Sequence, residues 1–262
     1  MNTASTRPEH DALATGRREG RSAVASLAAR LAVAAVIPGV VLGVVVLAVA
    51  GAIVGLIVAV AVWALVAGAL WFGLVAPRIG SAEERVLHLV GPHRRADPRR
   101  DARYLNLVEG LAPGAGLPRP DCVVIDDPSV NALAVGRDAR HGVLVATSGL
   151  LERMSRMELE GVIARGLAQL RDGTTAGPTV ALALGRVVTA GEWEALAADA
   201  QAVSLTRYPP GLSAALRTLL TARHDGAPDV PRSTSSTLAS LWLAPPGGAG
   251  ALERRAEALE AL

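Results

Sequence analysis

The 262-residue sequence contains no lysine, so all 26 of its basic side chains are arginines. Together with abundant alanine, glycine, valine and proline, this indicates a GC-rich genome rather than a particular function. The formal net charge is only +2 and the arginines are spread along the chain, so we expect no nucleic-acid partner. Cysteine is almost absent as well: Cys122 is the single one, which excludes an intramolecular disulfide and fits a reducing compartment.

Charged residues are missing from residue 31 to residue 77. As a continuous helix rising 1.5 Å per residue, this run would be about twice as long as the hydrocarbon core of a bilayer is thick. We therefore predict a hairpin of two transmembrane helices, over residues 31–50 and 52–75, with a turn at Gly51. Arginines flank the run on both sides, so the positive-inside rule places both flanks in the cytoplasm. The expected location is a bacterial cell membrane, crossed more than once, with the lipid bilayer as a partner.

Three regions follow from this pattern: a mobile polar tail over residues 1–30, the membrane hairpin over 31–76, and a cytoplasmic domain over 78–262. Within the domain, Gly136-Arg137-Asp138 supplies a turn that predicts a hairpin between two strands. The pair Ser155 and Glu158 is typical of a capping box that opens a helix. The predicted fold class is α+β and mainly helical with a small antiparallel sheet; the helices are 83–90, 103–110, 155–173, 189–207 and 253–262, and the strands are 121–125, 131–135 and 142–147.

The helix that begins near Ser155 has the spacing of a zinc-protease helix without its side chains. Such a helix carries His-Glu-x-x-His, in which two histidines one turn apart bind zinc and the glutamate activates a water molecule. The same places here hold Arg165, Gly166 and Gln169. A guanidinium repels a dication, glycine has no base, and an amide is a poor zinc ligand. We therefore expect no catalytic residue, no metal ion and no cofactor at these positions.

An ordered series of segments carries a family resemblance. In chain order they are residues 126–138, 145–151, 158–164, 198–200, 205–212 and 240–246. Together with the apolar N-terminal run, they resemble the HtpX-like membrane zinc metallopeptidases, a family related to the CAAX prenyl proteases. The resemblance implies a zincin-like (gluzincin) domain on the cytoplasmic side of the membrane.

The resemblance also implies what should occupy the metal centre. A third zinc ligand, a glutamate, belongs at Ala195, and an aspartate that binds the first ligand histidine belongs at Asp199, which is present. A further family histidine falls at Ala244. All four side chains of the metal centre and the extra histidine are therefore replaced, which indicates a dismantled centre rather than one misaligned residue.

Two interpretations of Arg165 remain open. Arg165 and Gln169 could form a solvated helix face, or Arg165 could form an ion pair with Asp199 in place of the metal link. By the resemblance, Asn131, Ala132, Leu133 and Ala134 form the edge strand to which a substrate chain adds. Such an edge could bind an extended peptide without zinc, although an ordinary hairpin strand is equally compatible with the sequence.

Three functions are compatible with these observations. The favoured one is a membrane-anchored pseudoprotease that binds a peptide or a partner protein, which could be an active family relative. The second is an active zinc metallopeptidase whose ligands come from other positions or another subunit. The third is a structural membrane protein whose cytoplasmic domain only contacts its neighbours.

Overall fold

The computed structural model describes residues 7–189 and 191–262, and it describes side chains from Pro38 onwards. The chain divides into two compact units, Met1–Ala69 and Leu70–Leu262. The polar tail predicted for residues 1–30 lies outside the residues whose side chains are described.

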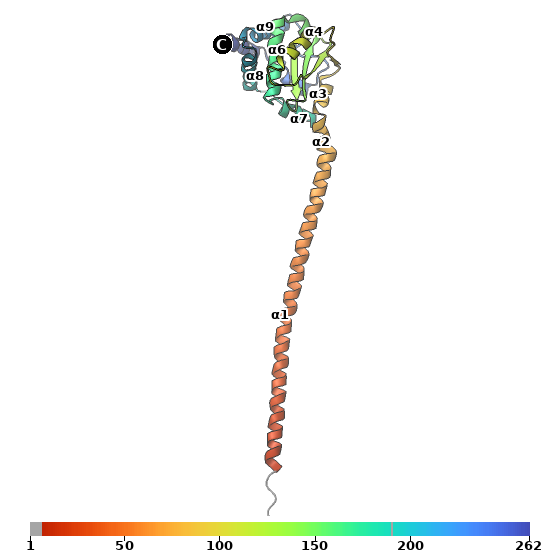
Figure 1. The fold of residues 1–262 in the computed structure, drawn as a ribbon, viewed down its shortest axis with the longest axis vertical. Helices are drawn as coiled ribbons and strands as arrows, with labels where there is room; N and C mark the ends of the chain where they lie inside the picture. The colour runs from red at the N-terminus through yellow and green to blue at the C-terminus, as the bar shows by residue number, and fades with distance from the viewer. Residues whose placement is uncertain (1–6, 190) are drawn as a thin grey trace, which may run out of the picture. The chain divides into compact units, whose positions relative to one another are not determined.

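The first unit is a single helix, α1, which runs from Arg7 to Leu70 (Figure 1). It is followed by the π-helical turn η1 (Trp71–Val75) and the short helix α2 (Ala76–Gly80). Among the described residues, the stretch Pro38–Gly80 is the one helix long and apolar enough to cross a membrane, with a mean hydropathy of 3.0.

The two-helix hairpin predicted for this region differs from the structure, because Gly51 lies inside α1 and no turn is present there. A glycine in a helix costs about 1 kcal/mol relative to alanine but does not interrupt the backbone hydrogen bonds. The residues around Gly51 are alanine, valine and isoleucine, none of which favours a turn. The length of the apolar run predicts a turn there, but no residue type typical of turns other than Gly51 supports it.

The second unit contains a four-stranded sheet in the order β1 (Arg94–Arg95), β2 (Asp121–Ile125), β4 (Gly142–Thr147), β3 (Ala132–Gly136). Strands β3 and β4 form the antiparallel hairpin that their turn residues predict. Strand β2, however, pairs in parallel with β4, so the sheet is mixed and the predicted purely antiparallel sheet is wrong. The physical reason is the path of the chain, which passes from β2 to the far edge as β3 and returns as β4 beside β2.

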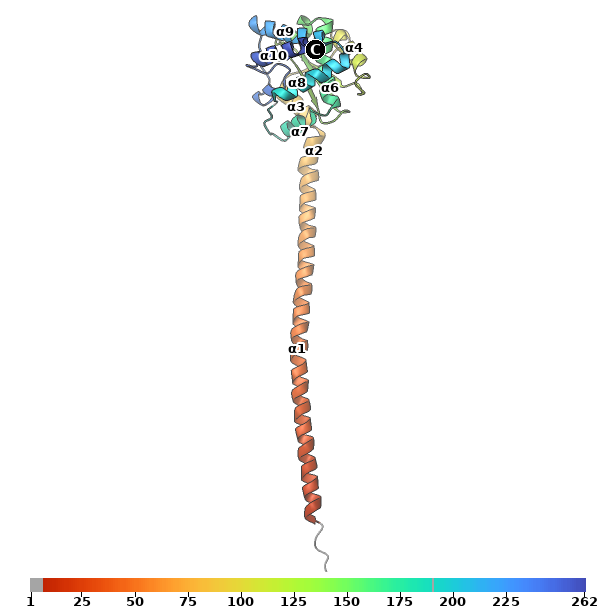
Figure 2. The ribbon, with the colours of Figure 1, turned by 90° about the vertical axis from the view of Figure 1, so that its left-hand side faces the viewer.

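The described residues of this unit form nine further helices besides the sheet, and α6 lies at the centre of them. A capping box joins Ser155 and Glu158 at the start of α6, as the sequence predicts. Helix α6 packs against α8 and α9, and α9 packs against α10 (Figure 2). The helices are α3 (Ala82–Val90), α4 (Ala102–Leu111), α5 (Ser148–Arg153), α6 (Arg156–Arg171), α7 (Ala176–Ala183), α8 (Glu192–Thr206), α9 (Pro209–His224), the 3-10 helix η2 (Ser236–Leu241) and α10 (Ala249–Glu260).

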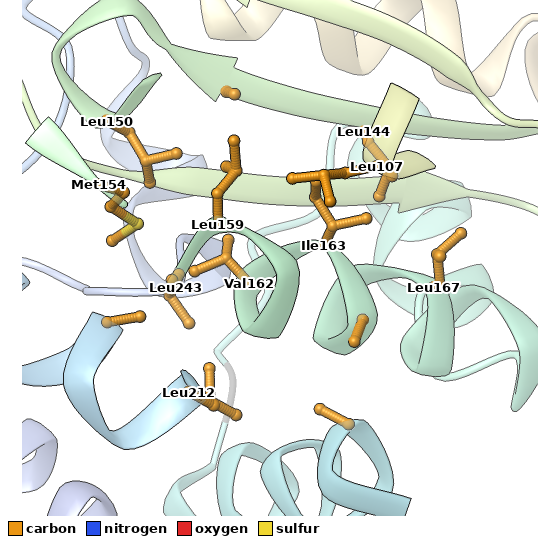
Figure 3. Close-up of a cluster of buried hydrophobic side chains, with 14 of the residues drawn as sticks. Leu107, Leu144, Leu150, Met154, Leu159, Val162, Ile163, Leu167, Leu212 and Leu243 are labelled. Atoms are coloured by element: carbon orange, nitrogen blue, oxygen red, sulfur yellow. The ribbon is translucent and has the colours of Figure 1, made fainter. Parts of the chain in front are cut away.

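The main hydrophobic core fixes α6 between the sheet and α9 (Figure 3). Leu159 and Ile163 lie on the sheet side of α6, while Leu212 of α9 lies on the other. Gly161 allows the close approach of α9, because a Cβ atom at this position would lie 2.7 Å from the backbone nitrogen of Leu212. The side chains of α6 that face neither layer are therefore held in defined positions toward α8.

Candidate functional site: a buried arginine and aspartate cluster

Arg165 and Gln169 lie one turn apart on α6, and Ala195 and Asp199 lie one turn apart on the facing helix α8. The Nε atom of Arg165 donates a hydrogen bond of 2.8 Å to Oδ1 of Asp199. Both residues are buried, with 8% and 2% of their surface exposed. Arg165 Nη1 also donates to Oε1 of Gln169 at 3.2 Å. Arg165 therefore belongs to a buried ion pair and not to a solvated helix face.

A second arginine, Arg255 of α10, binds the same carboxylate. Its Nε donates to Asp199 Oδ2 at 2.7 Å, and its Nη2 donates to Asp199 Oδ1 at 2.9 Å. The remaining Nη1 donates to the carbonyl oxygen of Leu243 at 2.8 Å. Arg255 is 3% exposed, so the cluster of Arg165, Asp199 and Arg255 joins α6, α8 and α10 in the interior.

The reasoning from sequence did not identify Arg255, although a signal for it exists. Leu252, Ala256 and Leu259 recur at helical spacing and all three are buried. This periodicity places Arg255 on the buried face of the terminal helix. Since a charged side chain in the core requires a partner, that position would have marked Arg255 for a carboxylate such as Asp199.

The cluster contains two positive charges and one negative charge. The pKa of Arg165 is lowered to about 10, because burial and the neighbouring charge of Arg255 lower it more than Asp199 raises it. Arg165 remains protonated at neutral pH. Its pKa is depressed because one carboxylate shared with a second guanidinium compensates only part of the desolvation.

The residues at this place do not fit a zinc ion. Guanidinium groups have no free lone pair for a metal, and two of them occupy the space around the only carboxylate of the cluster. The neighbouring Glu194 is engaged elsewhere, since its side chain accepts a hydrogen bond from the backbone nitrogen of Gly191 and caps α8. Among the described residues, no group of three or more His, Cys, Asp or Glu side chains is arranged to hold a metal ion.

Gly166, at the position of the family's glutamate, lies where α6 meets the hairpin. A Cβ atom there would lie 2.6 Å from Cδ2 of Leu144 and 3.6 Å from Cβ of Ala134. The missing side chain therefore lets α6 approach β4 closely, a gain that could not be seen from the sequence. Any larger residue at this position requires Leu144 to move.

The edge strand β3 is closed at both ends by other parts of the chain. The carbonyl oxygen of Ala132 accepts a 2.8 Å hydrogen bond from the backbone nitrogen of Leu243. At the other end, the carbonyl oxygen of Gly136 accepts a 2.9 Å hydrogen bond from the hydroxyl of Thr175. The backbone nitrogen of Gly136 donates a 3.1 Å hydrogen bond to the hydroxyl of Thr179. Because Leu133 faces β4 in the ladder, Ala134 is the residue of β3 whose outward backbone groups have no partner among the described residues.

The side chain of Asn131 fixes this arrangement. Its Nδ2 donates to the carbonyl oxygens of Asp229 and Ala244, at 2.7 and 2.8 Å. Its Oδ1 accepts from the backbone nitrogens of Ala132 and Ala244, at 2.9 and 3.1 Å. Asn131 is fully buried, and its side chain attaches the segments around Asp229 and Ala244 to the start of β3.

A cavity of about 670 Å³ lies beside the cluster, bounded by α6, α8, α10 and the segments around residues 177–191 and 240–248. Arg165, Gln169, Ala195 and Arg255 line it. The three positions that the resemblance assigns to zinc ligands, Arg165, Gln169 and Ala195, therefore all line one cavity. Asn131 and Ala132 of the edge strand do not line it.

Comparisons with known proteins find sequence similarity over part of the chain. Residues 98–174 match peptidase family M48. A protein named "Protease HtpX homolog" from Dictyoglomus thermophilum is 46% identical over 89 residues, which are 34% of this chain and 29% of that protein. This part of the chain is therefore similar to the M48 peptidases. Proteins of the same name from Dictyoglomus turgidum and Tropheryma whipplei (strain Twist) are 41% identical over 100 residues and 40% identical over 88 residues, which are 37% and 34% of this chain and 33% and 30% of theirs.

The sequence similarity covers only part of the chain and part of each relative. The chain spans about a third of the length of these curated relatives. The M48 match contains Arg165, Gly166 and Gln169 but ends before α8. Asp199 and Arg255 therefore lie outside the residues that the family match covers.

Proposed function

We propose that this protein is a membrane-anchored pseudoprotease, in which an HtpX-like domain binds a peptide or partner protein without cleaving it. The observation that carries the proposal is the ion pair of Arg165 with Asp199. A guanidinium occupies the position of a zinc ligand, and a second guanidinium, from Arg255, takes up the rest of the carboxylate. A divalent cation placed here would meet two positive charges and no suitable donor.

The membrane anchor is the apolar segment Pro38–Gly80. At 1.5 Å per residue its 43 residues extend over about 65 Å, whereas the hydrocarbon core of a bilayer is about 30 Å thick. A straight helix would expose roughly half of this apolar surface to water. Two crossings, over residues 31–50 and 52–75, would bury the whole apolar run, but they require a break at Gly51, where α1 is continuous. With arginines on both flanks, such a hairpin would keep both flanks in the cytoplasm of a bacterial cell.

The bound peptide belongs in the cavity rather than along β3. An added strand could reach only the outward backbone groups of Ala134, because Leu243 and the threonines of the α7 region occupy those of Ala132 and Gly136. Two hydrogen bonds are too few for recognition by strand addition. The cavity, in contrast, has a size typical of ligand sites.

A second candidate, an active metallopeptidase, is favoured by the names of the relatives, which are called proteases. It requires zinc ligands that come from another subunit or from outside the described residues. The protein purified in detergent separates the two candidates, because the pseudoprotease should contain no stoichiometric zinc and should not hydrolyse casein. Chelator-sensitive hydrolysis by the parent protein would overturn the proposal.

The matched control restores the metal centre with Arg165→His, Gly166→Glu, Gln169→His and Ala195→Glu. If this variant retains the helical circular dichroism of the parent, it should bind about one equivalent of zinc. Such a result would show that the backbone still supports the centre and that its side chains alone prevent metal binding.

A further inference from the structure

The inner end of the cavity carries an excess of positive charge. Arg165 and Arg255 share the single carboxylate of Asp199. The carboxylates that line the cavity, those of Glu192 and Glu194, are exposed. Glu192 pairs with Arg254 at 2.8 Å, and Glu194 caps the start of α8. A buried charge without a full counter-charge is costly, so this end of the cavity favours an anion.

Arg165 also has donor capacity that no described residue uses. Its Nε and one Nη1 hydrogen are used by Asp199 and Gln169. Its Nη2 makes no hydrogen bond to any described residue. This atom is not completely buried, because it is absent from the buried side-chain atoms that lack a partner. Arg165 lines the cavity, and Nη2 is its one guanidinium nitrogen without a hydrogen-bond partner among the described residues. Arg255, in contrast, uses all three of its nitrogens within the protein.

The remaining walls are mostly apolar. Val188, Leu241, Leu243 and Pro178 line the cavity together with Ala195. A small inorganic anion would leave most of the 670 Å³ without complementary contacts. A ligand that satisfies both ends must combine an anionic group with an apolar body.

Resting on the proposed function, we infer that the cavity binds the free C-terminus of an apolar peptide. The terminal carboxylate accepts hydrogen bonds from Arg165 Nη2 and Nη1, a fork geometry that guanidinium groups present to carboxylates. The last side chains of the peptide pack against Val188, Leu241 and Leu243. Capture of a C-terminal carboxylate is a general mode of peptide recognition that needs neither a metal ion nor an open strand edge.

The test uses the full-length protein in detergent and the acetylated tripeptide alanyl-leucyl-valine, either with a free carboxylate or as its C-terminal amide. Calorimetry should detect binding of the acid and at least a tenfold weaker binding of the amide. Equal affinity for acid and amide, or no binding of either, would overturn the inference. A third probe, 4-methylpentanoate, distinguishes the source of the carboxylate: if it binds as tightly as the tripeptide acid, the ligand is a small acid and the peptide assignment is wrong.

The decisive variant is Gln169→Glu, which places a carboxylate beside Arg165 Nη1 and supplies the missing counter-charge from within. It should lose at least tenfold in affinity for the tripeptide acid while its melting temperature rises, which shows that it folds. Gln201→Glu makes the same chemical change on α8, outside the residues that line the cavity, and should bind as the parent does. Unchanged affinity in Gln169→Glu would contradict the inference, whereas zinc-dependent proteolysis by the parent would contradict only the proposed function.

Discussion

At the scale of single residues, Asp199 is the least replaceable member of the buried cluster. It is the one anion in the cluster, and either arginine alone could balance its charge. Removal of the carboxylate leaves two buried cations without a counter-charge. Removal of Arg165 leaves a neutral pair of Asp199 and Arg255.

We therefore predict unequal effects on stability. Asp199→Asn should lower the free energy of unfolding by about 3–5 kcal/mol, the range for a broken buried ion pair. Arg165→Gln should cost about 1–2 kcal/mol, comparable with the loss of one or two buried hydrogen bonds. Thermal unfolding of both variants, followed by circular dichroism, checks the order. Equal losses would show that Arg255 does not compensate the charge of Asp199.

Cys122 offers an independent measure of burial. It is 8% exposed, and burial raises the pKa of its thiol to about 11 from the ordinary value of 9.0. The folded protein therefore keeps the thiol protonated and unreactive, because the thiolate is the nucleophile.

We predict that the disulfide reagent DTNB modifies Cys122 at pH 8 only after denaturation. The linkage with stability has a definite sign: between about pH 9 and 11 the unfolded chain loses the proton and the folded chain retains it, so stability falls with rising pH in that window. Cys122→Val should lack this decline. Rapid reaction of the native protein would contradict the burial.

The sequence could predict part of this site and not the rest. Arg165 and Asp199 could be paired in advance because helix spacing and the family resemblance put both at one place. The periodicity of α10 marks Arg255 as a buried arginine that needs a carboxylate, but it does not identify Asp199 as that carboxylate, because nothing in the sequence relates the register of α10 to that of α8. The close packing that Gly166 allows between α6 and β4 could not be predicted from the sequence either, since it depends on the distance between α6 and Leu144.

At the scale of elements, local signals predicted local structure. The capping box at Ser155 and the turn before Asp138 gave the correct helix start and hairpin. Helix α9 is absent from the predicted helices, although Pro209 and Pro210 fit the first turn of a helix. The partner of β2 was missed because pairing between strands distant in sequence leaves no local pattern.

Asn131 provides the prediction at this scale, since it attaches the segment around Ala244 to β3. Asn131→Asp replaces the donor Nδ2 by an oxygen opposite two carbonyl groups, which removes two buried hydrogen bonds. The expected loss is about 2–4 kcal/mol, together with faster amide exchange at Ala244. Asn106→Asp makes the same change at an exposed position of α4 and should have little effect. Equal stability of the two variants would mean that Asn131 does not hold this segment.

At the scale of the whole molecule, the number of membrane crossings is open to a direct test. The arginines on both flanks predict that both ends lie in the cytoplasm, which requires an even number of crossings. Epitope tags at the two termini should then be protected in intact cells. In a Gly51→Cys variant, the new thiol should react with a membrane-impermeant maleimide from outside, while the buried Cys122 gives little background. Termini on opposite sides would establish a single crossing.

The closure of β3 has a consequence for the behaviour of the protein at high density. A membrane confines its proteins to two dimensions, where encounters between identical domains are frequent. An exposed strand of several residues would let neighbouring domains join their sheets into aggregates. Among the described residues of β3, only Ala134 has outward backbone groups without a partner, so this edge offers a neighbouring domain too few hydrogen bonds for sheet-to-sheet joining.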